Sequence, residues 1–202
     1  YWLSITLARN QVVSLLGIPH ETQATLSEAD QVTINRVLDS MLPMSARMDR
    51  FAPDASEALK LAARCQHIRR WEIPRDSYPR DRIGYLKWRT ELKNMHARIA
   101  GEILGEAGYD GETIARVQSL LKKERLKQDA EAQVLEDVVC PVFLENWFAD
   151  FAKQHDPDKI IDFVAKTWKK MSPAGHEAAL AMAHTLPPDA LQLVQRALDG
   201  KT

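Results

Sequence analysis

Apolar side chains recur at three- and four-residue spacing along most of this chain, the spacing at which they share one face of an α-helix. One clear example is a run whose apolar positions are Ala58, Leu61, Ala62, Cys65 and Ile68. No stretch alternates between apolar and polar residues with period two for long enough to form a β-strand. The pattern therefore predicts an all-α protein, a single multi-helix domain of about nine helices.

Prolines, glycines and N-capping residues divide this pattern into separate helices. In chain order the predicted helices cover residues 3–16, 27–42, a segment that follows Ser56 and ends at Pro74, 81–105, a segment from 112 into the basic run 122–127, 134–151, 158–171, and two more that begin near 172 and 187. The helix that ends at Pro74 carries His67. Pro141 lies inside the predicted helix 134–151 and is expected to bend it. We expect one boundary between two parts of the chain, and it lies between residues 42 and 50.

The composition is that of a soluble globular protein. Of the 202 residues, 45% are hydrophobic and 27% are charged, which suits one domain with a core, with or without a helical extension. No apolar run approaches the ~18 residues of a membrane-spanning helix, so we expect no membrane partner. A net charge of −1 argues against a general nucleic-acid binder, which needs a broad basic surface. The two cysteines are expected to be reduced, buried thiols of a cytoplasmic protein.

One segment departs from this neutral balance. Residues 60–98 contain eleven Lys and Arg against four Asp and Glu, a local charge of +7, so the other residues together carry −8. A basic, proline-bent segment suits an anionic ligand such as a small phosphorylated molecule. The candidates for holding its phosphate are four arginines, because a guanidinium fork matches phosphate oxygens: Arg64, Arg70, Arg75 and Arg89. The alternative is that these arginines only form salt bridges with acidic helices.

A second set of residues has the chemistry of a metal site. Imidazole and carboxylate together suit Zn, Mn or Fe, and His67, His96 and Asp137 stand on three separate predicted helices. Asp137 shares a helix face with apolar residues, so its carboxylate must pair or bind a metal ion. We predict a divalent metal held by these three side chains, with Glu136 and Glu145 as substitute ligands. The alternative is an ion pair between Asp137 and an arginine, with His67 as a hydrogen-bonded core histidine.

Six short sequence stretches, which occur in order over about three quarters of the chain, resemble those of a bacterial family of uncharacterised all-α proteins, DUF4202. They are Ala-Pro-Asp-Ala-Ser-Glu-Ala-Leu (52–59), Arg-Cys-Gln-His-Ile-Arg-Arg-Trp (64–71), Gly-Tyr-Leu-Lys-Trp-Arg (84–89), Gln-Val-Leu-Glu-Asp-Val (133–138), Val-Phe-Leu-Glu (142–145) and Lys-Thr-Trp-Lys-Lys-Met-Ser (166–172). The resemblance covers residues 44–198 and implies kinship rather than an activity.

Residues 1–43 look different from the usual start of that family. The words Leu-Leu-Gly-Ile-Pro (15–19) and Leu-Ser-Glu-Ala-Asp (26–30) resemble a cap-region helix pair of α/β-hydrolases, although no Gly-x-Ser-x-Gly nucleophile elbow is present. We therefore expect an atypical N-terminal helical segment, 1–43, followed by a DUF4202-like all-α domain, 44–202.

The order of the helices is also similar to that of HD-type metal-dependent phosphohydrolases. His67 matches their His-Asp pair, His96 matches a later His, and Asp137 matches their final Asp, but Ile68 stands where the paired Asp is expected. The resemblance implies an HD-like helical architecture in which His67 and Asp137 are catalytic and a metal-bound water attacks a phosphate ester or nucleotide. The competing hypothesis is a non-catalytic helical binding or regulatory module that recognises an anionic ligand or a protein partner.

Overall fold

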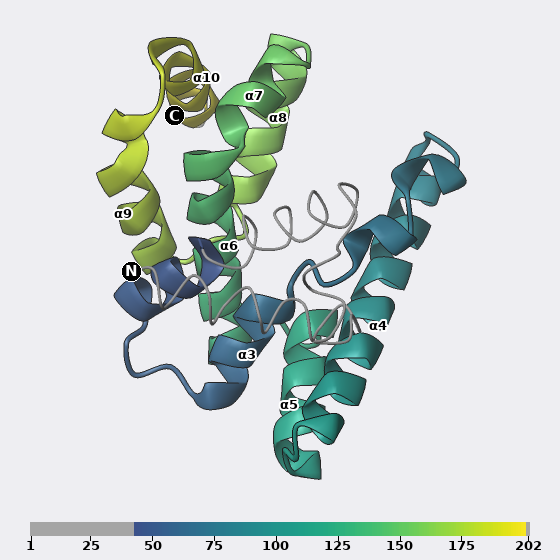
Figure 1. Ribbon diagram of the computed structural model, residues 1–202. Helices are drawn as coiled ribbons and strands as arrows, with labels where there is room; N and C mark the ends of the chain where they lie inside the picture. Colours follow the sequence, from purple (N-terminus) through teal and green to yellow (C-terminus); the bar gives the residue numbers. More distant parts are fainter. Residues whose placement is uncertain (1–42, 201–202) are drawn as a thin grey trace, which may run out of the picture. The chain divides into compact units, whose positions relative to one another are not determined.

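The computed structural model describes residues 43–200, and over this range every regular element is a helix (Figure 1). No strand occurs among these residues, which confirms the all-α fold class. The predicted helices 3–16 and 27–42 lie outside the described residues. None of the described helices is both long enough and apolar enough to cross a membrane.

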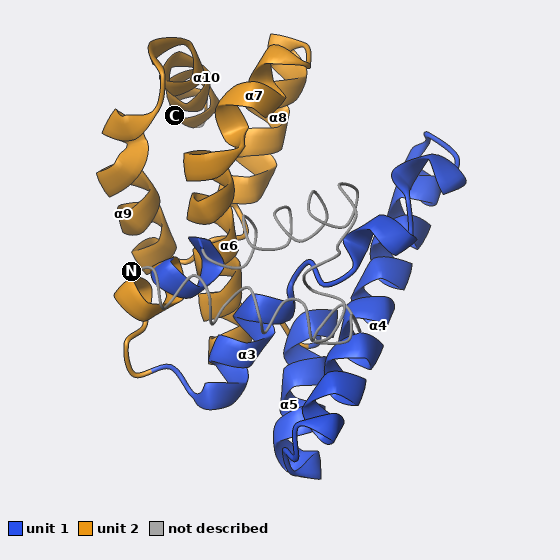
Figure 2. Ribbon diagram, viewed as in Figure 1, with its two compact units in different colours: residues 1–46, 55–124 blue, residues 47–54, 125–202 orange. Residues whose placement is uncertain are grey.

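The chain is divided into two compact units, which are coloured separately in Figure 2. Unit 1 consists of residues 1–46 and 55–124, and unit 2 consists of residues 47–54 and 125–202. In unit 1 the elements are α3 (Glu57–Cys65), the 3-10 turns η2 (Arg70–Glu72) and η3 (Arg75–Ser77), α4 (Arg82–Glu106) and α5 (Gly111–Lys122). In unit 2 they are α6 (Ala130–Asn146), α7 (Phe148–Lys153), α8 (Pro157–Trp168), α9 (Pro173–Met182), the 3-10 turn η4 (Ala183–Thr185) and α10 (Pro188–Asp199). Residues 43–51 are also helical.

Short polar side chains begin most of these helices, as the sequence predicts. Ser56 caps α3, Asp81 caps α4 and Ser172 caps α9, and each side chain accepts a hydrogen bond from a backbone N–H of the first turn. Such a cap satisfies one of the N–H groups that have no partner within the helix. The N-terminal boundaries of these three helices are therefore set by local chemistry.

In unit 1, α5 packs against both α4 and α3. Trp88 of α4 is buried beside Ile68 and Leu92, and its indole N–H donates a hydrogen bond to the carbonyl of Ile73 at 2.9 Å. This bond and the apolar contacts fold the proline-bent segment 69–80 back onto the N-terminal half of α4. The segment that carries the basic residues therefore has a defined position on α4.

In unit 2, α6 packs against α9 and α8 packs against α10. Its core contains Phe148, Ile160, Val164 and Val194, all of which are buried. Pro141 lies inside α6, as the sequence predicts.

Several predicted helices end earlier than expected; α8, for example, stops at Trp168 rather than at residue 171. The helix predicted to carry His67 and to end at Pro74 stops at Cys65, and His67 lies in the turn that follows. Arg69 then adopts a left-handed conformation with φ 48°, which a continuing α-helix cannot contain. The predicted helix 134–151 is two helices, α6 and α7, because Trp147 leaves the helical region with φ −135° and ψ −14°.

Candidate functional site

Three segments of unit 1 bring imidazole and guanidinium groups together. His67 lies in the turn after α3, Arg70 lies in η2, and Arg89 and His96 lie on α4. Arg89 and His96 are seven residues apart, so they project from the same face of that helix. The charges of Arg70, Arg89 and His96 all influence the pKa of His67. We call these four residues, His67, Arg70, Arg89 and His96, the unit 1 cluster.

Both histidines of the cluster are held in the neutral form. Burial, followed by the positive charges of Arg70 and Arg89, lowers the pKa of His96 to about 4. Burial is also the main cause that lowers the pKa of His67 to about 3, with Arg70 the next contribution. Because the usual value is 6.5, both rings are uncharged near pH 7. Each ring then has one nitrogen that donates a hydrogen bond and one that accepts.

The two arginines of the cluster have their charges close together. The guanidinium carbon of Arg70 lies 4.8 Å from the centroid of the Trp88 ring, a cation–π contact. Burial, and then the nearby charge of Arg89, lowers the pKa of Arg70. Within residues 43–200, no ion pair joins either arginine to an acidic side chain. The cluster therefore carries positive charge that no described carboxylate balances by direct contact.

Two buried side-chain nitrogens of this region have no hydrogen-bond partner among residues 43–200. They are Nε2 of His96 and Nε2 of Gln66, the residue that directly precedes His67. A buried polar group without a partner costs roughly 1–3 kcal/mol, so native proteins satisfy such groups with water, an ion or a ligand. The amide of Gln66 can only donate through this nitrogen, so an acceptor oxygen is its complement.

The other two candidate arginines are held by other hydrogen-bond partners, although the guanidinium carbon of Arg75 also lies over the Trp88 ring, 5.8 Å from its centroid. Arg75 donates hydrogen bonds to the carbonyls of Tyr78 and Pro79, at 3.0 and 2.9 Å, and so stabilises the bend before α4. Arg64 is exposed and donates to the hydroxyl of Ser45 at 3.3 Å. Of the four arginines that the sequence suggests for phosphate binding, Arg70 and Arg89 are the two that join the histidines.

Asp137 belongs to unit 2 and is almost fully buried there. Its carboxylate accepts hydrogen bonds from the backbone N–H of Ser172 at 2.8 Å, the Ser172 hydroxyl at 2.6 Å and the Gln133 amide at 3.0 Å. Both oxygens are thus bonded, and they fix the start of α9 against α6. These donors belong to a serine and a glutamine. The arginine predicted as an alternative partner of Asp137 is not among them.

The predicted metal ligands belong to different units, since His67 and His96 are in unit 1 and Asp137 is in unit 2. Within the described part of either unit, no three His, Cys, Asp or Glu side chains gather closely enough to hold a metal ion. Of the substitute ligands, Glu145 forms an ion pair with Arg47, and Glu136 is buried. The metal site formed by His67, His96 and Asp137 stays a prediction.

Sequence reasoning did not identify Gln66, Tyr85 or Lys123 as part of this region. Tyr85 influences the pKa of Arg70, and Lys123 influences that of His67. The available signal for Tyr85 was its position four residues before Arg89 on the same helix face. Lys123 follows α5, whereas His67 lies in the turn before α4. No sequence spacing predicts that these two residues lie near each other.

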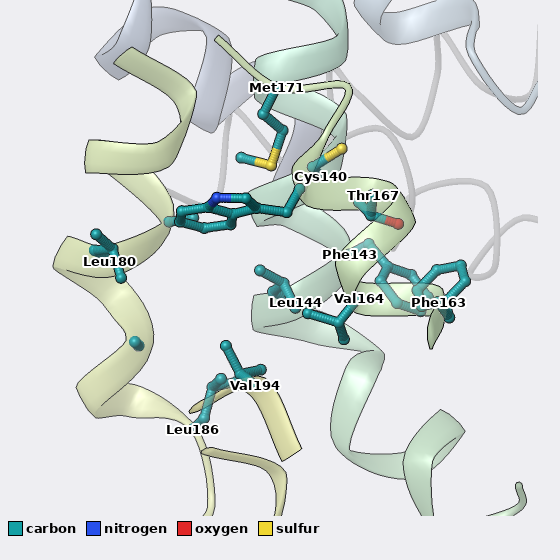
Figure 3. Close-up of a pocket in the computed structure, with 13 residues that line it drawn as sticks. Cys140, Phe143, Leu144, Phe163, Val164, Thr167, Met171, Leu180, Leu186 and Val194 are labelled. Carbon is teal, nitrogen blue, oxygen red and sulfur yellow. The ribbon is translucent and has the colours of Figure 1, made fainter. Parts of the chain in front are cut away.

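Unit 2 contains an apolar pocket that the sequence did not predict (Figure 3). It lies among α6, α8, α9 and the start of η4, with Val194 from α10, and Cys140, Leu144 and Met171 lie at its wall. Its volume is about 30 Å³, enough for little more than one or two water molecules. The lining is almost entirely apolar, with the Thr167 hydroxyl among the few polar groups, so the pocket suits an apolar group better than a polar ligand.

Comparison with known proteins identifies one family. The model of a family described as a domain of unknown function, DUF4202, matches residues 10–194. The match begins well before residue 44, the start of the predicted DUF4202-like domain, and it therefore includes most of the segment 1–43. No curated protein and no solved structure matches the chain. The resemblances to HD-type phosphohydrolases and to an α/β-hydrolase cap receive no support from these comparisons.

Proposed function

The chain belongs to the DUF4202 family, and from the geometry of unit 1 we propose that it binds a small anionic ligand through a phosphate group. The observation that carries this proposal is the pairing of Arg70 with Arg89 beside two neutral histidines, without an acidic side chain bonded to either arginine among the described residues. An anion is the complement of this arrangement.

Electrostatics supports an anion rather than a cation. The guanidinium groups of Arg70 and Arg89 repel one another, since the charge of Arg89 lowers the pKa of Arg70, and the burial of Arg70 strengthens that repulsion. A phosphate between them would convert the repulsion into two attractive interactions and could accept bidentate hydrogen bonds from each planar fork. A metal dication in the same place would add to the positive charge.

The hydrogen-bonding groups support the same choice. Gln66 supplies a buried N–H donor that has no partner in the described part of the chain, and Nε2 of His96 can act as another donor. A phosphate oxygen accepts from both kinds of group. Neutral imidazoles also need no counter-ion when the ligand is absent, so the empty cluster is tolerated near pH 7. We therefore assign ligand binding to Arg70, Arg89, His67 and His96, with Gln66 as a further donor.

The test is a calorimetric titration of the full chain with sodium sulfate and, separately, with inorganic phosphate. Arg89→Gln removes one guanidinium and keeps a polar side chain of similar length. We expect it to weaken anion binding about tenfold or more, which corresponds to ~1.4 kcal/mol. The matched control is Arg98→Gln on the same helix, since Arg98 pairs with the exposed Glu102 at 2.8 Å.

The control variant should bind both anions with unchanged affinity. If the wild-type chain binds neither anion at millimolar concentration, the proposal is wrong. Equal loss of affinity in Arg89→Gln and Arg98→Gln would also overturn it, because it would indicate a general charge effect rather than a site.

A second proposal, metal-dependent phosphohydrolase activity, has one favourable observation. The low pKa values of His67 and His96 keep both rings in the neutral form that binds metal ions. In that case Asp137 would be the third ligand, and Arg70 and Arg89 would hold the phosphate that is cleaved. The hydrogen bonds that Asp137 accepts from Ser172 and Gln133 would have to rearrange or be shared.

Metal content measured by mass spectrometry separates the two proposals. The purified, tag-free chain is compared with Asp137→Ala and with His96→Gln, each after incubation with Mn, Fe or Zn. Near-stoichiometric metal that is lost in both variants would support the hydrolase. If the wild-type chain holds no metal while sulfate binding is intact, the metal mechanism is wrong and anion binding remains.

A further inference from the structure

The N-terminal half of α4 carries an exposed, largely apolar stripe, centred roughly 100° around the helix axis from the face of Arg89 and His96. Ile83, Leu86 and Thr90 follow one another at spacings of three and four residues, so they lie on one face. We call these three residues the outer stripe. The same face continues along α4 through three residues at equivalent helical positions: Ala97, Gly101 and Leu104.

The C-terminal continuation of this face is covered by α5. Ala97 is 1% exposed and Leu104 is 4% exposed, and the Gln118 amide of α5 donates a hydrogen bond to the carbonyl of Ala97 at 3.1 Å. Gly101 lies so close to Gln118 that a Cβ atom there would meet the amide. This half of α4 therefore has the close packing of a helix–helix interface.

In contrast, the described helices leave the outer stripe exposed. Ile83 is 66% exposed and Leu86 is 54% exposed. At 1.5 Å per residue, the 25 residues of α4 span about 37 Å while the 12 residues of α5 span about 18 Å. Figure 1 shows the N-terminal turns of α4 extending past the end of α5. The stripe is thus a helix-packing surface for which α5 is too short.

The charges beside the outer stripe are positive. On the helical wheel Arg82 and Lys87 lie on either side of it, and Arg80 stands just before the helix. The only nearby acid bonded to one of them among the described residues is Asp76, which pairs with Arg80 at 2.8 Å on the surface. A partner that covers the stripe would therefore meet basic groups at both edges.

We propose that the outer stripe binds an amphipathic helix of an acidic partner protein. The apolar face of that helix covers Ile83 and Leu86, and its Asp or Glu side chains pair with Arg82 and Lys87. A second copy of this chain fits less well, because a two-fold contact through the stripe would place these basic residues against their own copies. Leu86 lies three residues before Arg89 on α4, so the stripe borders the unit 1 cluster; the proposal nevertheless uses Ile83, Leu86 and their flanking basic groups, and it does not require anion binding.

The experiment uses a synthetic helical peptide as the probe. Its leucines recur at three- and four-residue spacing, glutamates flank them, and a fluorophore allows binding to the full chain to be followed by anisotropy. We expect Leu86→Glu to weaken binding about tenfold or more, because it places a carboxylate where the peptide brings apolar groups and glutamates. Leu180→Glu in unit 2 is the matched control, since Leu180 is also 54% exposed.

A second peptide with lysines in place of the glutamates tests the charge argument. It should bind at least about tenfold more weakly than the glutamate peptide, and the difference should shrink at high salt. Equal binding of the two peptides, or an unchanged affinity in Leu86→Glu, would overturn the proposal. Sedimentation of the chain alone gives the remaining outcome: a dimer that Leu86→Glu dissociates would show that a second copy is the occupant.

Discussion

Asp137 illustrates, at the scale of a single residue, what a sequence can and cannot specify about a buried acid. Its position among apolar residues correctly predicts that the carboxylate must find partners. The partners themselves come from Ser172, 35 residues later in the chain, and from Gln133, one turn earlier. The choice between serine, arginine and a metal ion depends on how α9 approaches α6, and no spacing within α6 contains that information.

The close approach of α9 to α6 leads to a prediction about Gly175. A Cβ atom at this position would overlap the carboxylate of Asp137. We expect Gly175→Ala to lower the free energy of unfolding by about 1–3 kcal/mol, because the carboxylate must move and lose hydrogen bonds. Urea unfolding followed by circular dichroism measures the change.

The control for this substitution is Gly105→Ala in α4. A Cβ atom there would make only an ordinary contact with Ile114, at 3.9 Å, so the higher helix propensity of alanine should leave stability unchanged or raise it by up to ~1 kcal/mol. If Gly175→Ala were as stable as Gly105→Ala, Asp137 would not be tightly held by the start of α9.

At the scale of whole elements, the sequence predicts where helices begin better than where they end. The caps Ser56, Asp81 and Ser172 are local signals, and each precedes a helix in the structure. The break at Trp147 has no such signal, because neither proline nor glycine marks it and the apolar spacing continues from α6 into α7. The end of α3 at Cys65 depends on the left-handed Arg69 and on the packing of the next segment against α4.

Side chains that converge from different elements are harder to predict. The periodicity of α4 places Arg89 and His96 on one face, and this much can be read from the sequence. That Arg70 and His67 lie against the same face depends on the segment 69–80 folding back, which the Trp88–Ile73 hydrogen bond secures. The basic character of the region was therefore predictable. The tertiary structure was needed to show that Arg70 and Arg89, rather than Arg64 and Arg75, lie beside the histidines.

At the scale of the whole molecule, the neutral histidines link stability to pH. In the unfolded chain His67 and His96 have the usual pKa of 6.5, and in the folded chain about 3 and about 4. Between these values the unfolded state binds more protons, so stability is complete above pH 6.5 and is lost as the pH falls toward 4. We expect each histidine to remove about 2 kcal/mol of stability between pH 7 and pH 5.

Sulfate should oppose this loss if the unit 1 cluster binds anions. A bound anion favours the protonated form of the neighbouring imidazoles and raises their pKa, so sulfate should bind more tightly at pH 5 than at pH 7. Urea unfolding at both pH values, with and without sulfate, measures both effects. His96→Gln removes one titrating ring and should reduce the pH dependence, whereas His184→Gln, which changes an exposed histidine of unit 2, should not. An unchanged pH dependence in His96→Gln would mean that this ring titrates normally in the folded chain, and the electrostatic argument for an anion site would then lose its basis.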